Sequence, residues 1–324
     1  MSIAVPLYGF GASGGSPNKS TIIVTAPTGS TVTCKMGSTT KTATEKNGAW
    51  TFGGLDLGTW TITSAKGGDS ATQDVAITRL TVEYVTIVYR ITPEFTYTGD
   101  YEIVDDSDNP ISDFANWKNN WKIRFLTSGT FTVTKLNGWN GQLDVFLVGG
   151  GGNGETVRGA RGGGGGYTKT VKGVSIAIAT PYTITIGASS GTSSAFGASA
   201  NGASGVNGGS GGGGGGSSSG TSGDGGSNGG NGTAGNVSQG GTGQGTTTRE
   251  FGESTGKLYS GGGGGSAANA GAAGDSTAGA GAAYGGAAKN GVANTGGGGG
   301  AAYSGTAGRG GSGIVIARNA RGAA

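Results

Sequence analysis

The sequence offers few residues that could carry catalysis. It contains no histidine, which removes Ser-His-Asp and Cys-His nucleophilic catalysis, imidazole general bases and most zinc sites. Glycine runs satisfy a G-x-G-x-x-G pattern trivially, but no Gly-Lys-Ser/Thr completes a phosphate loop. Acids of the glycine-rich half, such as Glu155, Glu253 and Asp275, are scattered, and only the fold would decide whether two of them could act on a glycosidic bond. We therefore expect no enzymatic activity, no cofactor and no metal site.

Two further features could suggest chemistry but have simpler explanations. The segment 105–110, Asp-Asp-Ser-Asp-Asn-Pro, clusters carboxylates that would suit calcium, yet it lacks the spacing and glycine of an EF-hand loop. A solvated turn before the proline is the better prediction. The only cysteine, Cys34, alternates with Val32 and Met36. It cannot form an intrachain disulfide, and we predict a buried core thiol in a protein that folds in a reducing cytosol.

Residues suited to molecular recognition occur in two chemically rich patches, 153–161 and 246–254, and as tyrosines beside glycine runs. Aromatic and charged side chains in loops are the usual contacts of a binding surface. A solvated rim is the alternative for the arginines, and packing against the glycine runs is the alternative for the tyrosines. The predicted contact residues are Arg158, Arg161, Arg249, Glu250, Phe251, Tyr259, Tyr284 and Tyr303.

These patches interrupt a glycine lattice that fills the C-terminal half. Of the 78 glycines, 62 lie from Gly149 onward, in runs at 149–152, 162–166, 211–216, 261–265 and 296–300. Collagen is excluded, because glycine does not recur at every third residue and Pro181 is the only proline of this half. A flexible linker is the default for such composition, but apolar strands at 142–148 and 313–318 bound the stretch, and a floppy insert of this length would be unusual.

The ordered alternative is a bundle of polyglycine-II-type helices. Such helices have three residues per turn and no internal hydrogen bonds, so every amide and carbonyl needs a partner on a neighbouring helix. Glycine allows the backbones to approach closely enough for this. We predict a bundle formed by 149–166 and 187–312, with side chains at its rim and in its turns.

The first third of the chain has short alternating strands separated by turn residues. The pattern from 20 to 90 predicts a small antiparallel β-sandwich of about seven strands, preceded by an attachment arm at 1–19. The stretch 47–62, Asn-Gly-Ala-Trp-Thr-Phe-Gly-Gly-Leu-Asp-Leu-Gly-Thr-Trp-Thr-Ile, resembles carboxypeptidase-regulatory, or prealbumin-like, sandwich modules. The resemblance implies a spacer or docking role for 20–90.

The remaining strands predict a second sandwich. Residues 91–120 have the pattern of a linker followed by a hairpin about Gly99. Strands at 121–148, 167–186 and 313–318 predict a jelly-roll-like sandwich whose loops expand into the glycine bundle. The fold class is therefore all-β, with a glycine-rich domain at 121–324.

Several blocks of this domain resemble the glycine-rich domain of bacteriophage tail fibre and receptor-binding proteins. The blocks are 143–152, 162–168, 182–187, 259–265 and 310–316. The resemblance implies a virion protein that contacts a glycan or protein of the host surface and associates with other tail proteins, in symmetric groups for which a trimer is favoured. The alternative is a non-adhesive structural component, such as a fibre spacer or capsid decoration protein.

Charge and hydropathy limit the remaining partners and locations. The net charge of +3 is spread along the chain without a Lys/Arg block, which argues against nucleic acid and anionic membranes. No signal peptide or membrane span is expected. A virion protein made in the host cytoplasm and released by lysis, to act at the surface of the next host, fits these observations.

Overall fold

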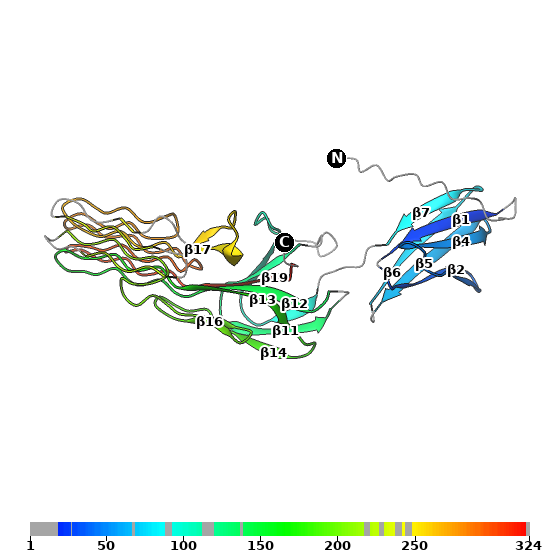
Figure 1. The fold of residues 1–324 in the computed structure, drawn as a ribbon, viewed down its shortest axis with the longest axis horizontal. Coiled ribbons are helices and arrows are strands. Elements are labelled where there is room, and N and C mark those ends of the chain that lie inside the picture. The colour runs from blue at the N-terminus through cyan, green and yellow to red at the C-terminus, as the bar shows by residue number, and fades with distance from the viewer. Residues whose placement is uncertain are drawn as a thin grey trace. The chain divides into compact units, whose positions relative to one another are not determined.

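The computed structural model describes residues 19–26, 28–66, 69–87, 93–111, 120–136, 139–216, 221–226, 230–236, 242–243 and 248–321. The chain divides into two compact units, Met1–Ile91 and Thr92–Ala324 (Figure 1). All but the last residue of the predicted attachment arm lies outside the described residues. The described residues form β-strands and one short 3-10 helix, without an α-helix, which confirms the predicted all-β class.

The first unit is a two-sheet sandwich. One sheet has the order β4-β1-β7 and the other β3-β2-β5-β6. Pairing is antiparallel except between β1 and β7, which run parallel. The strands are β1 (Ser20–Thr25), β2 (Thr31–Met36), β3 (Thr39–Thr42), β4 (Ala49–Leu55), β5 (Gly58–Lys66), β6 (Asp69–Ile77) and β7 (Val82–Thr86).

The core of this unit consists of alternating strand residues, as the predicted strands of 20–90 require. Trp50, Trp60 and Ile62 are each no more than 1% exposed, because every second residue of a strand points to the same face. Cys34 is fully buried in the same cluster, as predicted. Burial raises the pKa of its thiol to about 11, despite the nearby charge of Lys41.

The second unit contains the second predicted sandwich. A five-stranded sheet has the order β13-β12-β19-β10-β9, and a three-stranded sheet the order β14-β11-β8. Phe125 and Phe131 meet between the two sheets, with ring centroids 5.4 Å apart. The strands are β8 (Glu94–Tyr97), β9 (Tyr101–Val104), β10 (Lys122–Phe125), β11 (Gly129–Lys135), β12 (Gln142–Val148), β13 (Thr168–Ser175), β14 (Pro181–Ile184) and β19 (Ile314–Asn319).

The hairpin predicted about Gly99 is wrong, although both of its strands exist. β8 pairs with β11 in the three-stranded sheet, whereas β9 pairs with β10 in the five-stranded sheet. The chain therefore crosses from one sheet to the other at 98–100. Alternation identifies a strand and its buried face, but it does not identify the partner strand.

The middle of the five-stranded sheet is buried on both faces. Leu143–Val148 of β12 are all buried, as are Ile314–Arg318 of β19. One face packs against the three-stranded sheet, and Phe146 on the other face meets Phe251 and Tyr259. Those two rings come from an excursion of the glycine lattice, so the lattice and the sandwich share one core.

The glycine lattice itself extends from this sandwich as a bundle of long, nearly straight segments (Figure 1). Successive amides of one run donate to different neighbours, and every third amide returns to the same one. Along 162–166 the bonds are Gly162 to Gly213, Gly163 to Gly299, Gly164 to Gly205, Gly165 to Ser210 and Gly166 to Gly296. This period of three is that of a polyglycine-II helix, and it confirms the predicted bundle for the described glycine runs. Two segments of the predicted range 187–312 are β-hairpins instead, at 193–200 and 248–259, and residues 217–220, 227–229, 237–241 and 244–247 lie outside the described residues.

Close packing explains why these runs consist of glycine. An ideal Cβ placed on Gly163 would lie 2.0 Å from the carbonyl oxygen of Gly152, and one placed on Gly299 would lie 2.1 Å from that of Gly308. A Cβ atom essentially never approaches an oxygen so closely. The helices are therefore held together by backbone hydrogen bonds at distances that only glycine permits.

Candidate functional site

The eight predicted contact residues fall into two groups within the second unit. Arg158, Arg161, Tyr284 and Tyr303 belong to turns of the glycine lattice. Arg249, Glu250, Phe251 and Tyr259 belong to a short hairpin formed by β17 (Thr248–Arg249), the 3-10 helix η2 (Glu250–Gly252) and β18 (Leu258–Tyr259). Figure 1 shows this hairpin where the lattice meets the sandwich.

Hydrogen bonds join the lattice turns into one surface, which we call the loop end and define as residues 155–161, 266–270, 282–287 and 302–306. The Ala302 amide donates to the Glu155 carbonyl at 3.0 Å, and the Ser266 amide donates to the Ala160 carbonyl at 3.0 Å. The Gly285 amide donates to the Ser304 hydroxyl at 3.1 Å. These turns are separated by up to about half the chain in sequence, yet the lattice aligns them.

The loop end lies at the end of the lattice remote from the sheets. The run 296–302 starts beside the strand β19, where the Gly296 amide donates to the Ser312 carbonyl, and it ends where Ala302 meets Glu155. Six residues at about 3.1 Å each place these two ends about 19 Å apart. The turns are thus presented on a rigid stalk of cross-bonded backbone.

The exposed side chains of the loop end include the predicted tyrosines. Tyr284 is 54% exposed and forms an edge-to-face pair with Tyr303, with ring centroids 4.1 Å apart. Arg158 is exposed, and its neighbour Val157 is 56% exposed. The sequence prediction omitted Val157, because a lone valine in a polar segment has no distinguishing pattern.

Arg161 has an internal role instead. Its Nη2 lies 2.6 Å from Glu155 Oε1, and its backbone amide and Nε also donate to the same carboxylate. Burial raises the pKa of Glu155, but the hydrogen bonds and charge of Arg161 outweigh it and leave that pKa lowered. The pair closes the 155–161 turn, so it supports the surface rather than forming a free contact.

The hairpin corrects three of the predicted contacts. Glu250 and Phe251 are each 4% exposed, and Tyr259 is fully buried. The rings of Phe251 and Tyr259 cover Phe146 of β12, and this hydrophobic contact folds the segment down onto the sheet. Arg249 stays exposed, with Nη1 donating to the Gly256 carbonyl at 3.0 Å. The hairpin is therefore mainly a packing element.

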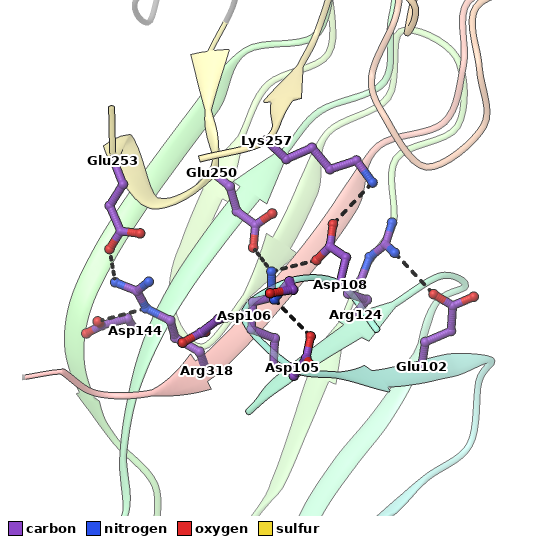
Figure 2. Close-up of polar contacts among 12 residues, drawn as sticks. Glu102, Asp105, Asp106, Asp108, Arg124, Asp144, Glu250, Glu253, Lys257 and Arg318 are labelled. Carbon is purple, nitrogen blue, oxygen red and sulfur yellow. Dashed lines mark hydrogen bonds and ion pairs between the residues drawn. The ribbon is translucent and has the colours of Figure 1, made fainter. Parts of the chain in front are cut away.

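A network of ion pairs holds the hairpin on the five-stranded sheet (Figure 2), and we call it the clamp. Lys122 of β10 is its centre: Nζ lies 2.6 Å from Asp108 Oδ1 and 3.0 Å from Glu250 Oε1. Burial lowers the pKa of Lys122, but the two carboxylates outweigh it and raise that pKa. The clamp comprises Asp106, Asp108, Lys122, Asp144, Glu250, Glu253, Lys257, Arg318 and Arg321.

The second centre of the clamp is Arg318 of β19, which is 3% exposed. Its guanidinium contacts Asp144 at 3.3 Å and Glu253 at 2.6 Å. Its Cζ lies 4.0 Å from the centroid of the Phe251 ring, a distance suited to a cation–π contact. Figure 2 shows Arg318 between the two carboxylates. The hairpin is thus fixed by packing and charge together.

The clamp lines a cleft of about 450 Å³. Its lining contains four acids and four bases, and each is ion-paired within the clamp. The 105–110 segment contributes as a tight turn, in which Asp105 accepts from the amides of Ser107 and Asn109. The predicted solvated turn is therefore partly engaged in the clamp, through Asp106 and Asp108.

Every charged side chain of the clamp has an ion-pair partner within it. Among the residues that the structure describes, no group of three or more His, Cys, Asp or Glu side chains has an arrangement that could hold a metal ion. In the same part of the chain, no helix is long and apolar enough to cross a membrane.

Comparison with known proteins identifies the second unit. A family model described as a glycine-rich domain matches residues 126–320. No curated protein matches the sequence. The crystal structure of a DUF3823 family protein from Bacteroides ovatus aligns with 51% of this chain and 79% of that chain, at 13% identity and a TM-score of 0.20. That similarity is too low to support any argument about fold or function.

Proposed function

The protein belongs to the glycine-rich domain family, and from this premise we propose that it is a bacteriophage virion tail protein, a fibre or receptor-binding adhesin. In this proposal the loop end contacts a glycan or protein of the host surface. The first sandwich docks the chain to other virion proteins, and the chain works in symmetric groups such as trimers. The preceding module is proposed to be of the carboxypeptidase-regulatory type.

The observation that carries this proposal is the gathering of exposed side chains on the loop end. Tyr284 and Val157 are both more than half exposed, and exposed apolar side chains that gather on one surface can mark an interaction site. Tyrosine and arginine are also the residues enriched at the energetic centres of interfaces. A surface that exposes both kinds on a rigid support is suited to binding.

The lattice gives this surface two useful properties. Its helices are bonded through backbone groups, so residues of the turns can change without removing the bonds that hold the lattice. Its rigidity also reduces the entropy that the loops lose on binding. A receptor-binding protein that must adapt to new surfaces would benefit from both.

The test is binding of the labelled full chain to intact cells of a candidate host. Tyr284→Ala and Arg158→Ala should each weaken binding, and Tyr284→Ala by about thirtyfold, the size of a 2 kcal/mol contact. The matched control is Tyr84→Ala, because Tyr84 of β7 is an exposed tyrosine of the first unit, 76% exposed.

Unchanged binding by both loop-end variants would contradict the proposed contact surface. A folded full chain that binds no candidate host would favour the alternative, a non-adhesive fibre spacer or capsid decoration protein. In that case, removal of the first sandwich should deplete the protein from particles, whereas the loop-end variants should have no effect.

A further inference from the structure

A second hollow, of about 420 Å³, lies between β13 and the hairpin. Lys169 and Lys172 of β13 line it together with Arg249 of β17, and no acid is among its lining residues. All three cations are exposed. The cleft of the clamp has as many acids as bases among its lining residues. The hollow beside β13, which we call the cationic groove, has only cations among its charged lining residues.

The cations of the groove remain available for a ligand. None of the three forms an ion pair with an acid among the described residues. The charge of Lys172 does reach Glu253 and helps to lower the pKa of that carboxyl, but the larger cause is the hydrogen bond from Arg318. Glu253 is thus already engaged elsewhere. Arg249 is held in place by its bond to the Gly256 carbonyl.

The sheet supplies hydroxyl groups to the same groove. β13 is the edge strand of the five-stranded sheet, and Thr170 is the cross-strand partner of Phe146. Thr168 and Thr170 both line the groove, beside the nearly buried Phe146 and Phe251. A groove that places exposed cations beside hydroxyls can bind an anionic ligand that also carries hydroxyl groups.

We propose that the cationic groove binds an oxyanion, phosphate or carboxylate, carried on a saccharide chain. The two lysines and the arginine would neutralise the anion and donate hydrogen bonds to its oxygens. The hydroxyl of Thr170 would bond to a neighbouring sugar hydroxyl. The volume of the groove is within the range of sites that enclose a small ligand, which is enough for a sugar unit and its charged substituent.

A nucleic acid fits this groove less well. Proteins that bind single strands stack bases on exposed aromatic rings, whereas Phe146 and Phe251 are 1% and 4% exposed. Three cations are also few for a surface that must follow a phosphate backbone. The saccharide is therefore the favoured carrier of the anion.

This site is separate from the loop end, so it goes beyond the proposed function and can be tested independently. The test uses isothermal titration of the full chain with four defined probes at low ionic strength. A phosphorylated dextran oligomer and an oligogalacturonate distinguish phosphate from carboxylate. A neutral dextran and a single-stranded oligodeoxynucleotide are the comparisons.

We expect one or both anionic saccharide probes to bind, the dextran not to bind, and added salt to weaken the affinity. The double variant Lys169→Gln/Lys172→Gln should bind at least about fivefold more weakly, since each lost charge interaction at a surface changes affinity a few-fold. The matched control is Lys35→Gln/Lys289→Gln, which removes the same charge from two exposed lysines elsewhere.

Three outcomes would overturn the inference. They are no binding of either anionic saccharide, an equal loss in the matched control, or tighter binding of the oligodeoxynucleotide than of the saccharides. Tyr284→Ala should leave probe binding unchanged, because Tyr284 lies on the loop end. If the groove binds neither anionic saccharide, the proposal that the loop end contacts the host surface still stands. If the loop-end variants bind host cells normally, the proposed groove site still stands.

Discussion

A single methyl group at Gly163 should disrupt the lattice, because this residue lies between three neighbouring helices. Its amide donates to the Gly299 carbonyl at 2.8 Å, and its own carbonyl accepts from the Gly263 amide at 2.8 Å. A Cβ atom added to Gly163 would lie 2.0 Å from the carbonyl oxygen of Gly152. Gly163→Ala would therefore place a methyl group where no space exists.

The loss of unfolding free energy caused by Gly163→Ala follows from these distances. An ordinary contact between carbon and oxygen is about 3.3 Å, so the helices would have to separate by about 1.3 Å. Hydrogen bonds of 2.8 Å do not survive such a shift. Each buried backbone group left without a partner costs about 1–3 kcal/mol, and the two lost bonds leave two amides and two carbonyls unpaired, so the cost is about 4–12 kcal/mol. A domain has a total stability of about 5–15 kcal/mol.

Differential scanning calorimetry of the full chain measures this effect, because the two units should give separate transitions. Gly163→Ala should lower the transition temperature of the second unit and leave the transition temperature of the first unit unaltered. The matched control is Gly286→Ala on the loop end, where the nearest atoms are 3.3 Å from the ideal Cβ. Equal melting of Gly163→Ala and wild type would refute the close-packed lattice.

Two further predictions concern the clamp. Lys122→Met should cost about 3–5 kcal/mol of unfolding free energy, because it leaves the buried Glu250 carboxylate without a cation; Lys135→Met, which breaks an exposed pair with Glu94, should cost less than about 1 kcal/mol in the same urea titration. Burial raises the pKa of Asp108, but the bond and charge of Lys122 outweigh it and lower that pKa. The stabilisation by Asp108 is therefore complete above its ordinary pKa of 3.8 and is lost as the pH falls through the lower folded value. Urea midpoints measured against pH should decline less steeply for Asp108→Asn, and an equally steep decline would contradict this assignment.

The strands and the lattice could be predicted from sequence because each has a local period. Alternation locates Trp50 and Trp60 in the first core and Phe131 in the second. The lattice follows from a different argument, since long glycine runs between two apolar strands must satisfy their backbone groups on neighbours. Local patterns fix the type of element and its buried face.

Pairings between distant residues could not be predicted in the same way. Asp144 and Arg318 form a buried ion pair across 174 positions, and no local pattern connects them. The predicted hairpin about Gly99 failed for the same reason, because strand partners are set by the whole sheet. The composition of 246–254 predicts exposed contacts. For Phe251 this prediction is wrong, because its ring packs against Phe146 and anchors the hairpin.

Saturable binding of the full chain to host cells tests the claim that the loop end of the glycine lattice recognises the host surface. The measurement compares intact cells with cells stripped of surface glycans. Saturable binding that is lost on stripping, and weakened by Tyr284→Ala, is the predicted result for a glycan adhesin. Binding that survives stripping and still depends on Tyr284 would indicate a protein receptor. No saturable binding by a folded chain in its native oligomeric state would contradict the claim.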